Sequence, residues 1–159
     1  MAGKGGKAYY TPPSLSLVQE ASLTGFIDFQ ERNLVVPGGV PNFVRGGDIV
    51  VLREWFEERD ALVVEAVSGR WSSLSDLVDV LKGPLQMPPW SGDSVDAVLD
   101  FIPEILESRP KPAAVVIRSF SALAANDLHL AAQVVYGGLM ISDELGSNGQ
   151  QLTLFFCEE

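Results

Sequence analysis

The sequence predicts an α/β protein: a small three-stranded parallel sheet covered by helices, preceded by a short β-rich N-terminal extension. Apolar runs typical of buried strands occur at residues 61–67, 113–117 and 152–157. Helical patterns fill the stretches between these runs, so the predicted order from residue 61 is β-α-α-β-α-β. Because parallel strands need a crossover segment between them, this alternation favours a parallel sheet with helices packed on it.

The chain is predicted to divide into an N-terminal extension, residues 1–59, and a compact domain, residues 60–159. The first residues are rich in Gly and Lys and are predicted to be disordered. Turn signals of the Pro-Gly and Gly-Gly type then separate three short strand candidates in the extension, at residues 23–29, 34–36 and 48–52.

Two helices are predicted between the first two strands of the domain. Residues 73–76 read S-L-S-D, which resembles a capping box, and apolar side chains follow at helical spacing until Gly83-Pro84 ends the helix. The second helix follows a Pro-rich turn and carries an apolar stripe opposite an acidic face. Pro103 lacks an amide hydrogen, so we expect this helix to kink or stop near residues 101–102.

The stretch at residues 120–145 consists mostly of helix formers and is predicted to be helical. Gly137 and Gly138 weaken this prediction by about 1 kcal/mol each, and a hairpin at VVY-GG-LMI is the alternative. If the stretch is helical, its apolar stripe is predicted to comprise Leu128, Ala131, Ala132, Val135 and Leu139.

The composition is that of a globular protein with a strongly acidic second part. Of 159 residues 47% are hydrophobic, and the net charge is -10. Residues 60–159 hold five Lys and Arg against fourteen Asp and Glu, about -9, which disfavours nucleic acid and anionic membranes and attracts basic proteins. No apolar run approaches the roughly 20 residues of a membrane span. With no signal peptide and a single cysteine, Cys157, expected to be buried, the sequence predicts a cytoplasmic protein.

The familiar motifs of catalysis are missing from the sequence. It holds no G-x-S-x-G, H-E-x-x-H, phosphate-binding glycine loop or C-x-x-C pattern, and His129 is its sole histidine. Carboxylates are numerous enough for acid–base work or an oxygen-ligand metal site, yet no spacing separates them from surface charge. The sequence therefore predicts no enzyme activity, no metal and no cofactor.

An acidic helix face is the most distinctive feature of the chain. It contains Asp93, Asp96, Asp100, Glu104 and Glu107, and Trp90 lies in the turn before it. By periodicity alone this pattern is typical of a solvated helix face, with Leu99 in the core and Trp90 packed on the helix start. The other interpretation is a docking site for something positively charged.

Residues 81–102, LKGPLQMPPWSGDSVDAVLDFI, resemble the signature of the barstar family of intracellular ribonuclease inhibitors. In that family a Leu-Pro turn leads through an aromatic pair, a glycine and an acidic residue into a helix with the pattern Asp-Ala-Leu, aromatic, Asp. The similarity extends more weakly over residues 60–159 and leaves residues 1–59 unmatched. Ten residues match the signature without a gap: Leu81, Lys82, Leu85, Pro88, Trp90, Gly92, Asp93, Asp96, Ala97 and Asp100.

The resemblance implies an immunity protein that plugs the active site of a basic nuclease with this helix and the turn before it. The carboxylate of Asp100 would occupy the cationic pocket meant for the scissile phosphate, Asp96 would add a second contact, and Trp90 would cover the catalytic histidine. A rigid helix presents such anions at little ordering cost, and a carboxylate accepts bidentate bonds from Arg. The implied partner-binding residues are Trp90, Ser91, Gly92, Ser94, Asp96, Leu99 and Asp100.

Three positions depart from the family pattern. Ser91 replaces the second aromatic residue, Ser94 replaces an asparagine, and Leu99 replaces the aromatic residue before the last Asp. Each change removes anchor area or a hydrogen bond, so the chain is expected to suit a diverged nuclease or to have lost inhibition. A noncatalytic adapter with the same fold and another protein partner is the alternative function, and a small enzyme using carboxylates ranks last.

Overall fold

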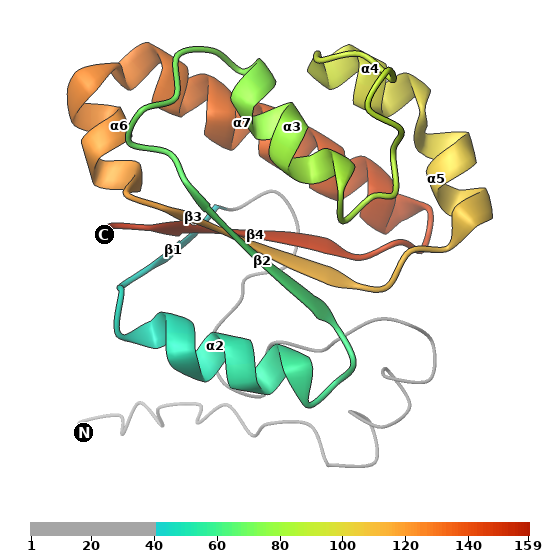
Figure 1. The fold of residues 1–159 in the computed structure, drawn as a ribbon, viewed down its shortest axis with the longest axis horizontal. Coiled ribbons are helices and arrows are strands. Elements are labelled where there is room, and N and C mark those ends of the chain that lie inside the picture. The colour runs from blue at the N-terminus through green and yellow to red at the C-terminus, as the bar shows by residue number, and fades with distance from the viewer. Residues whose placement is uncertain (1–40) are drawn as a thin grey trace, which may run out of the picture.

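The computed structural model describes residues 41–159, which form a parallel sheet with helices on both faces (Figure 1). The α/β prediction is confirmed. The strands run in the order β1-β4-β3-β2, and every neighbouring pair is parallel. Their bounds are β1 (Asn42–Val44), β2 (Leu62–Val67), β3 (Ala113–Arg118) and β4 (Leu152–Cys157). The helices are α2 (Asp48–Glu57), α3 (Ser75–Lys82), α4 (Val95–Asp100), α5 (Ile102–Ser108), α6 (Phe120–Asn126) and α7 (Leu128–Ser147).

The direction in which the chain crosses the sheet explains the placement of the helices. From β2 through β3 to β4 each crossover moves to the neighbouring strand in one direction, whereas the step from β1 to β2 moves the opposite way across the sheet. Because crossovers between parallel strands are right-handed, a reversal of direction places the connecting helix on the other face. Accordingly α3 to α7 cover one face, and among the described elements α2 is the one helix on the other face (Figure 1).

The sheet has a hydrophobic core on each face. Successive side chains of a strand point to opposite faces, so β3 supplies Ala113, Val115 and Ile117 to the core under α3–α7, and Ala114 and Val116 to the core under α2. All five side chains are buried, which is why the β3 sequence is a continuous apolar run. The predictions for β2, β3 and β4 are confirmed within a residue, and Cys157 is a buried free cysteine as expected.

The sheet has four strands rather than the three predicted, and the predicted strand at residues 48–52 is wrong. That segment begins α2, whose buried residues Ile49, Leu52, Trp55 and Phe56 follow helical spacing. The β-branched residues of DIVVL suggested a strand, but the apolar stripe continues into Trp55-Phe56, beyond the length of that strand. The fourth strand, β1, pairs with β4, and α2 packs on the same sheet. Residues 42–57 therefore belong to the same folded unit as the rest. The strands predicted at 23–29 and 34–36 lie outside the described residues.

The long stretch after β3 is helical, and the hairpin alternative is excluded. Its predicted apolar stripe had the wrong phase, because Leu128 is 72% exposed and Ala132 is also exposed. The buried face is instead Leu130, Ala131, Val134, Gly137, Gly138, Ile141 and Leu145. A stripe predicted from apolar side chains leaves out Gly137 and Gly138, although both belong to the packed face.

The glycine pair in α7 permits close approach to its neighbours. A Cβ atom built on Gly137 would lie 2.9 Å from Val95 Cγ2 of α4, and one on Gly138 would lie 3.0 Å from Leu154 Cδ2 of β4. Both spaces are tighter than ordinary packing allows. The glycines therefore set how closely α7 lies to α4 and to the sheet.

The two predicted helices before β3 are present, and the second is divided in two. α3 ends at Gly83 as predicted. The Asp76 carboxylate accepts hydrogen bonds from the amides of Ser72 and Ser73, which is one half of a capping box. The break between α4 and α5 falls at Phe101, with Pro103 near the start of α5, as its missing amide hydrogen predicts.

Candidate functional site

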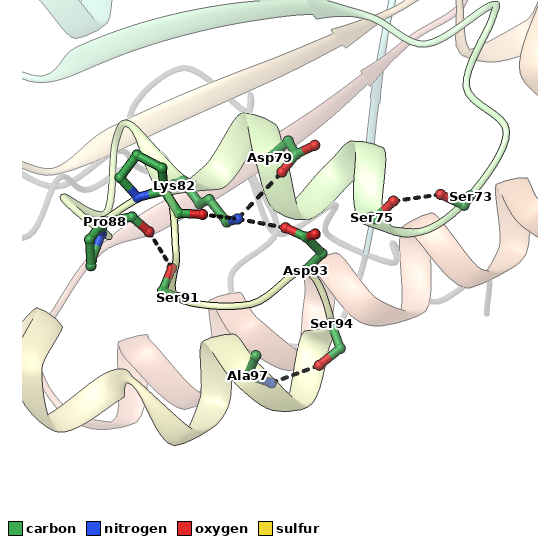
Figure 2. Close-up of polar contacts among 10 residues, drawn as sticks. Ser73, Ser75, Asp79, Lys82, Pro88, Ser91, Asp93, Ser94 and Ala97 are labelled. Atoms are coloured by element: carbon green, nitrogen blue, oxygen red, sulfur yellow. Dashed lines mark hydrogen bonds and ion pairs between the residues drawn. The ribbon is translucent and has the colours of Figure 1, made fainter.

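The candidate site is built from the turn at residues 83–94 and helix α4, which together project from the helical face of the sheet (Figures 1 and 2). The turn leaves α3 at Gly83 and enters α4 at Ser94. All seven residues implied by the family resemblance lie on this turn or on α4, within residues 90–100. The structure therefore places them on one short continuous piece of chain.

Trp90 lies at the outer end of the turn and is 79% exposed. The next residue closes the turn, since the Ser91 amide and the Ser91 hydroxyl both donate to the Pro88 carbonyl, at 3.0 and 2.6 Å. On its inner side the indole meets the Phe101 ring edge-on, with ring centroids 6.4 Å apart and an interplanar angle of 83°. A large aromatic side chain is thus held on a proline-braced turn with most of its surface facing solvent.

Gly92 occupies a position that only glycine fits. Its φ is +93°, where L side chains are strained, and a Cβ atom there would lie 2.9 Å from Ala97 Cβ of α4. The glycine thus allows the turn to fold back against the first turn of α4. Its contribution to the site is the path of the backbone.

Helix α4 is short and is fixed by its cap and its buried face. The Ser94 hydroxyl accepts a hydrogen bond from the Ala97 amide at 3.0 Å (Figure 2), a standard N-cap that satisfies one orphan donor. Val98 is fully buried, and Leu99 is partly buried and packs against the core. Ser94 and Leu99 thus hold α4 in place. The family resemblance implies instead that Leu99 faces the partner.

We expect Ser94→Ala to lower the free energy of unfolding by about 1 kcal/mol, within the 0.5–2 kcal/mol typical of a lost N-cap. A helix of six residues has little other means of satisfying its first amides. Urea unfolding monitored by circular dichroism measures the change. Ser94→Asn, which keeps an acceptor, should stay close to the unmodified protein; equal destabilisation by both variants would show that the cap is not the cause.

Asp96 and Asp100 lie on the solvent face of α4. They are four residues apart, which places their side chains on the same side of the helix, and both are exposed. Within residues 41–159 neither carboxylate makes a hydrogen bond or an ion pair. The described part of the chain therefore leaves two anions unneutralised on the helix that follows the turn carrying Trp90.

Asp93 differs from these two because it is paired with Lys82 of α3. Lys82 Nζ donates to Asp93 Oδ1 at 2.6 Å and to the Pro89 carbonyl at 3.2 Å, and it lies 3.5 Å from Asp79 Oδ1 (Figure 2). The hydrogen bond from Lys82, with its positive charge, lowers the pKa of Asp93, and the same contact raises the pKa of Lys82. Of the three aspartates in this stretch, one has its charge balanced internally.

The Asp93–Lys82 pair predicts a pH-dependent contribution to stability. Because the pKa of Asp93 is lowered on folding, the contribution is present above the ordinary aspartate value of about 3.9 and is lost as pH falls through the lower folded value. We expect the carboxyl ¹³C shift of Asp93 to titrate below about 3.9 and to move upward in Lys82→Met. An unchanged midpoint in that variant would mean that Lys82 does not stabilise the carboxylate.

Sequence reasoning found the turn and the acidic helix but missed Lys82 and Phe101 as parts of the site. The sequence analysis identifies Lys82 only as a match to the family signature. A single cation eleven residues before Asp93, with a Pro-rich turn between them, is nevertheless a pattern from which their pairing could be predicted. For Phe101 the sequence predicts only that a helix ends near it. Ser91, implied to face a partner, is half-buried and uses its hydroxyl to close the turn.

The remaining chemistry of the described residues is sparse. Across residues 41–159 no group of three or more His, Cys, Asp and Glu side chains is arranged to hold a metal ion, and His129 is exposed on α7. None of the helices in this range combines the length and the apolar character that crossing a membrane demands. No protein-family model matches the chain, and a search of curated proteins found no significant relative.

Proposed function

We propose that this chain is a cytoplasmic, barstar-like inhibitor that occludes the active site of a basic ribonuclease or related nuclease. The observation that carries the proposal is the pair of exposed carboxylates of Asp96 and Asp100, unpaired within residues 41–159, on a capped helix that follows the turn carrying the exposed indole of Trp90. A nuclease cleft holds its cations where phosphates bind, and two rigid carboxylates at helical spacing can occupy such a cleft.

The fold supports this proposal without carrying it. In the barstar family a strand and a helix precede the signature and two further strands follow it, and β2, α3, β3 and β4 occur here in that order. The additional strand β1 and helix α2 lie at the far edge and on the opposite face of the sheet, so they leave α4 uncovered (Figure 1). Fold alone does not assign function, and the proposal rests on the side chains of the turn and α4.

Energetically, the proposed interface combines an aromatic anchor with electrostatic attraction. Trp90 offers the large, rigid apolar surface typical of residues that dominate binding energy. The excess of negative charge in residues 60–159 accelerates encounter with a cationic partner, and the unpaired carboxylates supply the contacts in its cleft. In this proposal Leu99 and Ser94 support the helix, Gly92 and Ser91 shape the turn, and Trp90, Asp96 and Asp100 touch the nuclease.

The test is inhibition of RNA cleavage by a panel of purified basic ribonucleases, beginning with any nuclease encoded beside this gene. We expect stoichiometric inhibition of at least one enzyme, an association rate that falls with added salt, and no binding to a basic protein that lacks nuclease activity. Binding to the non-nuclease with equal affinity would indicate nonspecific charge attraction. Binding without inhibition would favour the adapter function.

A further inference from the structure

Lys82 is less exposed than a lysine on the surface of an α-helix ordinarily is, and it contacts more oxygen atoms. Its side chain is only 11% exposed, and its ammonium group has three oxygen atoms within 3.5 Å: Asp93 Oδ1, the Pro89 carbonyl and Asp79 Oδ1. An ammonium group has three hydrogens to donate, and Lys82 uses it for two hydrogen bonds and one longer ion pair. Such a lysine gives up the mobility and hydration that Lys side chains normally keep.

Two of these acceptors bracket the tip of the turn. Pro89 immediately precedes Trp90, and Asp93 immediately precedes Ser94, the N-cap of α4. Contact with both ends joins residues 89 and 93 to one atom of α3, so residues 90–92, which include Trp90, lie between the two contacts. Figure 2 shows the contact of Lys82 with Asp93. The third oxygen belongs to Asp79, one turn earlier on α3 itself, and forms an ion pair with the lysine.

We propose that Lys82 is a positioning residue, which fastens the turn to α3 and thereby fixes Trp90 and the start of α4 in the arrangement used for docking. The docking part of this inference rests on the proposed function. One consequence concerns charge: Asp93 is committed to Lys82, so the docking surface presents the carboxylates of Asp96 and Asp100 and not three equivalent anions.

Local hydrogen exchange of the free protein tests the positioning claim without any partner. The amides of Ser91 and Ala97 are the reporters, because they donate to Pro88 and to Ser94 respectively, and the amides of β3 serve as the internal reference. We expect Lys82→Met to raise exchange of the reporters by about fivefold or more, while exchange of β3 stays unchanged. Lys82→Arg should restore much of the protection because it keeps a cationic donor. Unchanged exchange at both reporters would overturn the inference.

Asp79→Asn is the matched control for this experiment. It alters a contact of Lys82 that lies on α3, so it should disturb the reporters much less than Asp93→Asn does, since Asp93 belongs to the turn. If the two variants raise exchange equally, Lys82 acts by stabilising α3 and not by fastening the turn.

A double-mutant cycle with the inhibited ribonuclease tests the docking part. If Lys82 acts through Trp90, Lys82→Met should speed dissociation about three- to tenfold in the unmodified chain and much less in a Trp90→Ala background, whereas its effect should add to that of Asp100→Ala. Full additivity with Trp90→Ala would overturn the inference while leaving the proposed function intact. Failure of every ribonuclease to bind, with exchange altered as expected, would instead overturn the proposed function and leave Lys82 as an organiser of the turn.

Discussion

Asp100→Ala is expected to weaken binding to the proposed ribonuclease partner by about 30-fold to several thousand-fold, the equivalent of 2 to 5 kcal/mol. The reason is that the Asp100 carboxylate is exposed in the free protein and would be buried in the proposed complex. In the free protein the carboxylate is exposed and unpaired within residues 41–159, so its removal costs the fold little. In the proposed complex the same change would leave the cations of the cleft buried without a counterion, and the penalty should appear mostly in the dissociation rate.

Three companion variants separate charge from shape and position. Asp100→Asn keeps the side-chain shape and should lose most of the affinity, because the amide carries no charge. Asp96→Ala should have a smaller effect of the same sign. Glu54→Ala on α2 removes an exposed carboxylate from the opposite face of the sheet and should leave the affinity unchanged. Binding is measured by stopped-flow association and dissociation at several salt concentrations; similar losses for Glu54→Ala and Asp100→Ala would contradict the docking model.

Phe56→Ala is expected to lower the free energy of unfolding by about 3 to 5 kcal/mol, the range for truncating a large buried aromatic residue. Phe56 is 1% exposed and stacks edge-on against Phe155 of β4 and against Trp55, with ring centroids 5.7 and 5.2 Å apart. It belongs to the core on the α2 face, where Val116 and Cys157 are also buried. The truncation removes transfer free energy and leaves a cavity among rigid neighbours.

The control for Phe56→Ala is Val50→Ala on the same helix. Val50 is 62% exposed, so this change should alter stability by no more than about 0.5 kcal/mol. Urea unfolding followed by circular dichroism compares the two. If Phe56→Ala costs less than about 1 kcal/mol, α2 is an appendage that the sheet does not need, and the second core is of minor importance.

The parts of the fold that sequence predicted are those in which local pattern and tertiary packing agree. The run at β3 is apolar throughout because it is buried on both faces. Pro103 ends α4 because it lacks an amide hydrogen and its ring crowds the preceding turn. The strand predicted at 48–52 failed because five residues cannot distinguish a helical stripe from a β-branched run. The phase of α7 was wrong because Gly137 and Gly138 carry no hydrophobicity signal, although both are buried.

In the candidate site, too, sequence predicted what local pattern determines and missed what tertiary contacts determine. Periodicity alone placed Asp96 and Asp100 on an exposed face, and both are exposed. It could not reveal that Asp93 is paired with Lys82, because that contact depends on how a twelve-residue turn folds back on α3. The internal roles of Ser91 and Ser94 could not be predicted for the same reason. Residue type alone does not distinguish a serine that closes a turn or caps a helix from one that contacts a partner.

The contact of Gly137 with Val95 has a consequence for how this surface can diversify. Val95 is one of the α4 residues that face α7, where it lies against Gly137, whereas Asp96 and Asp100 lie on the exposed side of α4. In the proposed docking role, exchange of those outward side chains would change the partner that α4 selects without disturbing its packing on α7. A larger residue at position 137, in contrast, would displace α4 as a whole.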